Sequence, residues 1–167
     1  MTRKTQEACR MFGVGSGFWK GSKILSNYLG RTKDFDLAPP IFVNMSFAGE
    51  VYLKCLLLKR TGKYPRGHDL KDLFDKLPPK DQAPIEDAYK NIVENSPVFR
   101  HLMKGQSVPK LSTVLAGAGK TFSKMRYSFE CEKGPPSPTV MLQEFIEAVQ
   151  ERLLAIDPKL KQVLMYF

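Results

Sequence analysis

Apolar residues recur at three- and four-residue steps along most of the chain, which is the spacing of one face of an α-helix. The strongest stripes predict helices over residues 41–60, 111–131 and 142–156. Shorter stripes predict helices over 18–29, 70–77 and 85–93. No segment alternates with the period of two that marks a half-buried strand. We therefore expect an all-α fold, an antiparallel bundle of four to five main helices.

Glycine and proline set the expected boundaries. Residues 1–17 are charged and then glycine-rich, so we expect a flexible N-terminal arm followed by one helical-bundle domain over 18–167. Two adjacent prolines cannot continue a helix, which predicts a connector over 34–40. Glycines and a proline predict a loop over 61–67, and residues 98–110 are ambiguous. Before the last helix, Ser137 and Pro138 have the residue types of an N-cap and a first helical position.

Composition narrows the class of protein. The 167 residues are 43% hydrophobic, which is enough for one continuous core. No apolar run approaches the roughly 18 residues of a membrane span. The polar N-terminus lacks the apolar stretch of a secretory signal. We expect a cytoplasmic chain that does not contact a membrane.

The three cysteines are Cys9, Cys55 and Cys131, and their spacing matches no disulfide or zinc pattern. The two histidines lie too far apart in sequence to propose a ligand pair. We expect a reducing compartment, no structural metal and no cofactor.

The net charge of +9 is unevenly distributed. Residues 95–129 contain six basic residues and no acidic one. A segregated positive field favours polyanionic partners, so RNA or a nucleotide is the expected ligand, although a merely solvated surface is the open alternative. The candidate nucleic-acid-binding residues are Arg100, Lys104, Lys110, Lys120 and Lys124.

The segment 116–121 resembles a phosphate-binding loop because it ends in Gly-Lys-Thr. That loop needs a further glycine at the position occupied by Val114, and it must follow a buried strand. Neither condition holds. We expect this segment to be helical, with its small residues allowing close packing or a kink.

Two polar pairs interrupt the predicted helices. Glu50 and Lys54 are four residues apart, in the order that favours an ion pair on one helix face. Arg126 and Glu130, with Tyr127 beside them, repeat this spacing on a later helix. Because buried charge is unfavourable unless it is paired, we expect these five residues to form one polar cluster between facing helices. Two separate surface pairs are the alternative.

Two segments resemble the HEPN family. Residues 46–58 read SFAGEVYLKCLLL, and they are followed by Gly62 and by GHDLKDLF over 67–74. Residues 125–130 read MRYSFE, which is similar to a segment of some members. The resemblance implies a helical bundle, commonly a homodimer, tied to RNA, nucleotides or host-defence systems of the toxin–antitoxin type. It further implies that active members are metal-independent ribonucleases with an Arg-x4–6-His motif.

This chain departs from that motif. Arg60 precedes His68 by eight positions, and no histidine follows Arg126. We therefore interpret the chain as a non-catalytic HEPN-like domain that binds RNA or a nucleotide, or that serves as partner to another protein. One alternative is a metal-independent ribonuclease that combines His68 with Arg60 or Arg126; another is a structural interaction module. His68 itself is expected to cap or orient the helix that begins beside it.

Overall fold

A computed structural model describes residues 2–102, 105–126 and 141–164 of the chain. These residues contain helices and no strand, so the expected all-helical class is confirmed. In chain order the elements are α1 (Arg3–Thr32), the short 3-10 helix η1 (Phe35–Leu37), α2 (Ala38–Thr61), α3 (Leu70–Asp75), α4 (Pro79–Asn95), α5 (Pro97–Leu102), α6 (Leu111–Arg126), α7 (Leu142–Ile156) and α8 (Leu160–Leu164).

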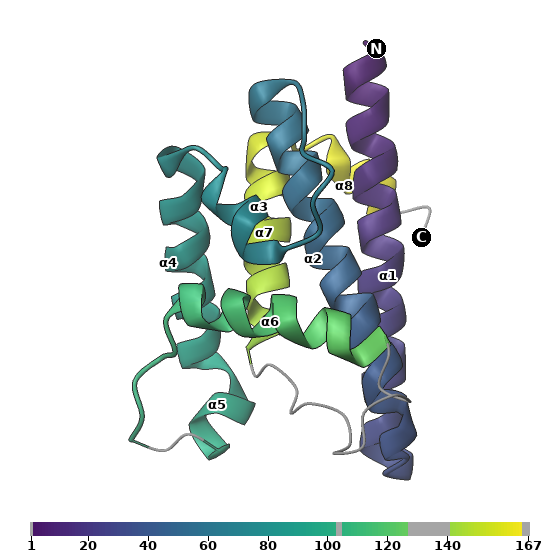
Figure 1. Cartoon of the computed structure of the whole chain (residues 1–167), viewed down its shortest axis with the longest axis vertical. Coiled ribbons are helices and arrows are strands. Elements are labelled where there is room, and N and C mark those ends of the chain that lie inside the picture. The colour runs from purple at the N-terminus through teal and green to yellow at the C-terminus, as the bar shows by residue number, and fades with distance from the viewer. Residues whose placement is uncertain (1, 103–104, 127–140, 165–167) are drawn as a thin grey trace.

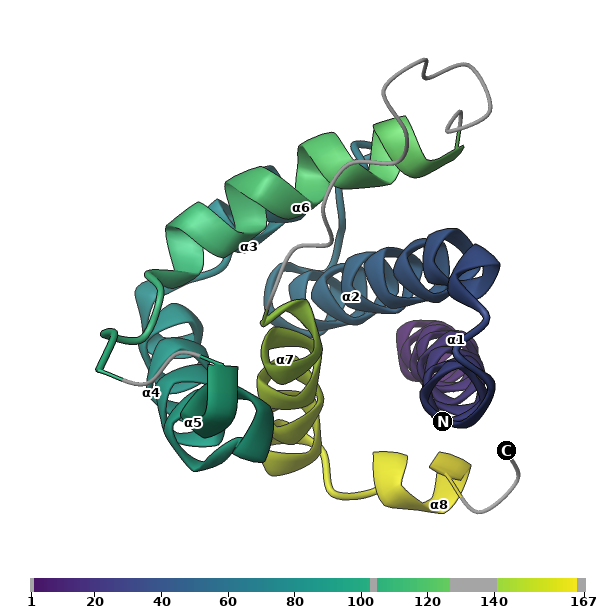
Figure 2. The same cartoon turned by 90° about the horizontal axis from the view of Figure 1, so that it is seen from below.

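The long helices α1 and α2 form an antiparallel hairpin, and α7 and α4 stand beside it in a curved row (Figures 1 and 2). Helices α3 and α6 cross one face of this row. The short α8 lies on the other face and packs against α1. Helix α2 therefore contacts neighbours on several sides.

The central position of α2 agrees with its sequence. All residues from Tyr52 to Leu58 are buried, including both faces of the helix. Residues Phe35–Thr61 are long and apolar enough to cross a membrane by length and composition, and 67% of their most apolar window is buried inside the bundle. The same properties are expected of a core helix.

The expected flexible arm is instead the first half of α1. Residues 3–17 are helical, and Ala8, Phe12 and Trp19 are buried. Three glycines in this segment lower the local helix propensity, which led the sequence prediction to a loop. Packing overrides that propensity, because a side chain at Gly15 would stand only 2.7 Å from the buried Tyr52 ring. The glycine lets the two helices approach closely.

Two proline segments also differ from expectation. Pro39 and Pro40 lie in the first turn of α2, where a missing N–H is tolerated. Pro84 lies inside α4 and cannot donate to the carbonyl of Lys80. The guanidinium of Arg152 donates to that carbonyl instead, at 3.1 Å. A contact from α7 thus replaces the hydrogen bond that proline removes.

The predicted helix over 142–156 is confirmed with the same bounds. Helix α6 is continuous through Gly117 and Gly119, so the expected helical reading of residues 116–121 is also confirmed. Helix α8 was not predicted from the tail sequence. The expected cap at Ser137 lies outside the described residues.

Candidate functional site

The charged residues in the middle of α2 are buried. Glu50 is 4% exposed and Lys54 is 9% exposed. Lys54 Nζ donates to Glu50 Oε1 at 2.8 Å across one helical turn, which confirms the expected pairing of these two residues. A buried carboxylate needs further donors to offset its lost hydration.

That further donor is His68, from the segment that leads into α3. His68 Nδ1 lies 2.9 Å from the same Oε1 atom of Glu50. A carboxylate only accepts hydrogen bonds, so Nδ1 carries the proton and Nε2 is left without one in the neutral ring. The side chain of His68 is 69% exposed. Glu50 therefore fixes one edge of the imidazole and leaves the opposite edge open to solvent.

The sequence prediction gave His68 a capping role, and the structure gives that role to Asp69. The carboxylate of Asp69 accepts from the backbone N–H of Asp72 at 2.9 Å, as an N-cap residue does. His68 instead joins the α2–α3 loop to the central helix. The loop comprises residues 62–68, and we refer to it below as the basic loop.

Two cations of the basic loop have no acidic partner among the described residues. Lys63 and Arg66 are both exposed, and neither side chain takes part in a hydrogen bond or ion pair with the described residues. Tyr64 between them is 41% exposed and donates to Glu7 at 3.0 Å. The ammonium of Lys4 lies directly over Gly62 and adds a cation from α1. The basic loop therefore carries exposed cations along its length and an oriented imidazole at its α3 end.

The basic residues that flank the loop are committed elsewhere. Arg60, a candidate partner of His68, binds both carboxylate oxygens of the fully buried Asp81 at 2.8 Å. Arg152 binds the same carboxylate at 2.7 Å. Lys59 pairs with Asp157 at 2.5 Å. The structure thus assigns Arg60 a role in packing and does not bring its guanidinium to His68.

Burial alone would raise the pKa of Asp81, but the hydrogen bonds and charges of Arg60 and Arg152 outweigh it and hold the pKa below its usual range. The carboxylate is therefore ionised at neutral pH and ties α4 to both α2 and α7.

The other three residues of the expected polar cluster, Arg126, Tyr127 and Glu130, have no described side chains. Arg126 is the last residue of α6, and its side chain is outside the described part of the chain. Tyr127 and Glu130 also lie outside it. The meeting of Arg126 with Glu50 therefore stays a prediction. The structure does bring together two residues that the sequence analysis treated separately, Glu50 and His68.

Of the candidate nucleic-acid-binding residues, two have described side chains, and both are exposed. Arg100 is exposed and donates to the carbonyl of Asn95 at 2.7 Å. Lys110 is exposed and precedes α6. Lys104, and the side chains of Lys120 and Lys124 on α6, are outside the described part of the structure.

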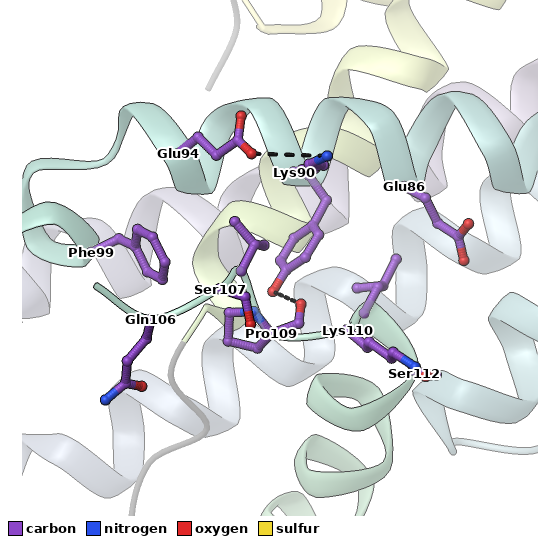
Figure 3. Close-up of a pocket in the computed structure, with 12 residues that line it drawn as sticks. Glu86, Lys90, Glu94, Phe99, Gln106, Ser107, Pro109, Lys110 and Ser112 are labelled. Carbon is purple, nitrogen blue, oxygen red and sulfur yellow. Dashed lines mark hydrogen bonds and ion pairs between the residues drawn. The ribbon is translucent and has the colours of Figure 1, made fainter. Parts of the chain in front are cut away.

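Lys110 also lines a cavity of about 700 Å³ between α4 and the segment before α6 (Figure 3). Its floor includes Tyr89, whose hydroxyl donates to the carbonyl of Pro109 at 3.0 Å. Lys90 and Glu94 face each other along its α4 wall at 4.0 Å. These polar groups interact with one another and do not point toward a common centre, so the cavity does not indicate which ligand it would bind.

No group of three or more histidine, cysteine, aspartate or glutamate side chains with the geometry of a metal site occurs among residues 2–102, 105–126 and 141–164. Within those ranges Cys9 and Cys55 are free thiols. Cys131 is outside them.

No family model, no curated protein and no solved structure matches this chain. The contacts described above are therefore the basis for assigning a function.

Proposed function

We propose that this chain is a HEPN-like RNA-binding domain that holds the phosphodiester backbone at its basic loop. The observation that carries the proposal is a loop with two exposed cations, Lys63 and Arg66, that have no ion-pair partner among the described residues, and with an imidazole that Glu50 orients. The resemblance of residues 46–74 to HEPN domains supports RNA as the polyanion.

The chemistry of the loop suits a phosphate chain. Arginine can bind two phosphate oxygens through its planar fork, and lysine adds a point charge. The exposed ring of Tyr64 offers a stacking face for an unpaired base, as in single-strand binding proteins. Among the described residues, the acids Glu7 and Glu50 accept hydrogen bonds from the loop side chains of Tyr64 and His68.

The experiment compares two double variants that each remove two positive charges from a different surface. Binding of a fluorescent 20-nucleotide single-stranded RNA is measured by anisotropy for the wild type and for Lys63→Ala/Arg66→Ala. The matched control, Lys80→Ala/Lys90→Ala, removes two exposed lysines from α4. We expect about a tenfold or greater loss for the loop variant, with the salt slope reduced by about two, and less than a twofold change for the control.

A third variant tests the surface that the sequence predicted, Lys104→Ala/Lys110→Ala/Lys124→Ala. If this variant loses binding and the loop variant does not, RNA binds at residues 95–129 and the basic loop is a solvated surface. Binding that is absent, or unaffected by salt, refutes the RNA proposal as a whole.

The Glu50–His68 contact favours one second candidate, a metal-independent ribonuclease. A carboxylate that holds Nδ1–H leaves Nε2 as a base. Nε2 would take the proton of a ribose 2′-hydroxyl, whose oxygen would attack the adjacent phosphorus. The bond to the 5′-oxygen would break, that oxygen would take a proton from water, and the products would be a 2′,3′-cyclic phosphate and a 5′-hydroxyl.

Cleavage assays with a chelator present separate the two candidates. The ribonuclease requires cleavage that His68→Ala abolishes and Glu50→Gln weakens. The binding domain requires no cleavage by the wild type, with RNA affinity retained at least in part by His68→Ala.

A further inference from the structure

The outer face of α1 carries an apolar groove that the described residues leave open. The groove has a volume of about 300 Å³ and is lined by Gly13, Val14, Gly17, Phe18, Gly21 and Asn44. Val14 is 47% exposed and Phe18 is 38% exposed. Large apolar side chains in such positions mark interaction surfaces when they are contiguous.

The groove has defined walls and a floor. Phe18 packs edge-on against Phe47 of α2, with ring centroids 4.6 Å apart, and this contact fixes one wall. No atom outside the helix approaches within 4 Å of a Cβ placed at Gly17. At Gly21 the nearest such atom is the side-chain nitrogen of Asn44, at 3.8 Å. Another backbone can therefore approach α1 closely between these two glycines.

The apolar face continues along the helix. Ile24 and Tyr28 are 58% and 54% exposed. At 3.6 residues per turn they fall on the same side of α1 as Val14 and Gly21. The stripe thus extends over about four turns, which is the length of a helix-in-groove contact.

Charge identifies the kind of occupant. From Ala8 to Lys33 the sequence has five basic residues and no acidic one. The groove is therefore set in a positive field, which favours an acidic partner.

We infer that the outer face of α1 binds an acidic amphipathic helix of a partner protein. The partner helix lays small and apolar side chains over Gly17 and Gly21, and its acidic flanks face Arg10 and Arg31. A second copy of this chain fits poorly, because residues 8–33, which contain no acid, would meet the same cations. A flat bilayer would leave the recess at the glycines unfilled. The inference is independent of the RNA proposal.

The test begins with peptide selection on the full chain. A phage library of random amphipathic helical peptides is selected on the wild type and counter-selected on Gly17→Leu, which fills the groove. We expect enriched peptides to carry net negative charge and an apolar stripe at helical spacing. Enrichment of neutral or basic peptides, or no enrichment, overturns the inference.

Affinity of the best synthetic peptide is then measured by fluorescence anisotropy. The matched control is Gly30→Leu, since Gly30 also has open space around it on α1 and lies outside the groove. We expect at least a tenfold loss for Gly17→Leu and less than a twofold change for Gly30→Leu, with circular dichroism showing both folded. Equal losses overturn the inference.

Two further measurements address other occupants. Sedimentation that shows a dimer of the wild type and a monomer of Gly17→Leu assigns the groove to a second copy. Binding to phosphatidylglycerol vesicles that Gly17→Leu abolishes, without peptide binding, assigns it to a lipid surface. Either result overturns the proposed partner, and neither bears on RNA binding at the basic loop.

Discussion

Replacing Gly15 with alanine tests how closely α1 and α2 are packed. The new Cβ would stand 2.7 Å from two carbons of the Tyr52 ring, well inside contact distance. The ring cannot easily move away. It is fully buried, it stacks on Phe12, and its hydroxyl is hydrogen-bonded to Ser16 at 2.9 Å and to Gln150 at 2.8 Å.

Two opposing terms set the magnitude. Overpacking a core by one methyl group lowers the free energy of unfolding by about 1–3 kcal/mol. Alanine in place of glycine inside a helix raises it by about 1 kcal/mol. We therefore expect Gly15→Ala to lower the free energy of unfolding by about 1 kcal/mol.

Gly17→Ala is the matched control, because a Cβ there meets nothing within 4 Å. It should raise the free energy of unfolding by about 1 kcal/mol. The propensity term cancels between the two variants, so their difference of about 1–3 kcal/mol measures the steric term alone. Urea unfolding followed by circular dichroism gives both values. Equal stabilities would refute the close approach of Tyr52 to α1.

Three further outcomes follow from buried ionisable groups. Asp81→Asn should lower the free energy of unfolding by about 3 kcal/mol, because it leaves Arg60 and Arg152 without their shared anion. Since the folded pKa of Asp81 is lowered, its contribution is fully present well above the unfolded pKa of about 4 and is lost as the pH falls through the lower folded pKa. The difference between wild type and variant in urea unfolding should therefore be smaller at pH 3 than at pH 7. Burial raises the pKa of Glu144, so ionising it destabilises the fold, and Glu144→Gln should stabilise the protein at pH 7 more than at pH 4 in the same assay. Burial raises the pKa of Cys55 to about 12, so iodoacetamide should leave this thiol unmodified in the native protein, as judged by peptide mass spectrometry.

Much of the fold was predictable because its helices carry periodic apolar residues. Helix α7 has a clean stripe from Leu142 to Ile156, and α2 is apolar on nearly every side. Helix α1 was only half predicted, since its glycines oppose helix formation locally. Their compatibility with a helix depends on Tyr52, which lies in another element and is invisible to a local pattern.

The candidate site was predictable only in part: Glu50, Lys54 and His68 were candidate residues, whereas Lys63, Tyr64 and Arg66 of the basic loop were not. Glu50 and Lys54 are four residues apart, so helical geometry alone pairs them. His68 reaches Glu50 from a loop whose path depends on how α3 packs, and no spacing rule gives that path. One feature of the sequence could have predicted the Glu50–His68 contact: a carboxylate within an apolar helix that has only one donor on its own helix can accept a hydrogen bond from a second donor.

The commitment of Asp81 to two arginines has a consequence for how the molecule opens. Arg60 lies near the end of α2, Arg152 lies near the end of α7, and both reach the first turn of α4. If any of the three helices separates, Asp81 or one of its two arginines loses an ion-pair partner while it is still partly buried. We expect them to open as one cooperative unit, with their central amides exchanging hydrogen for deuterium only through global unfolding. The six-residue helix α5, which follows α4, forms no ion pair among the described residues, so its amides should exchange through local fluctuations. The helices joined at Asp81 would then unfold together, while α5 opens on its own.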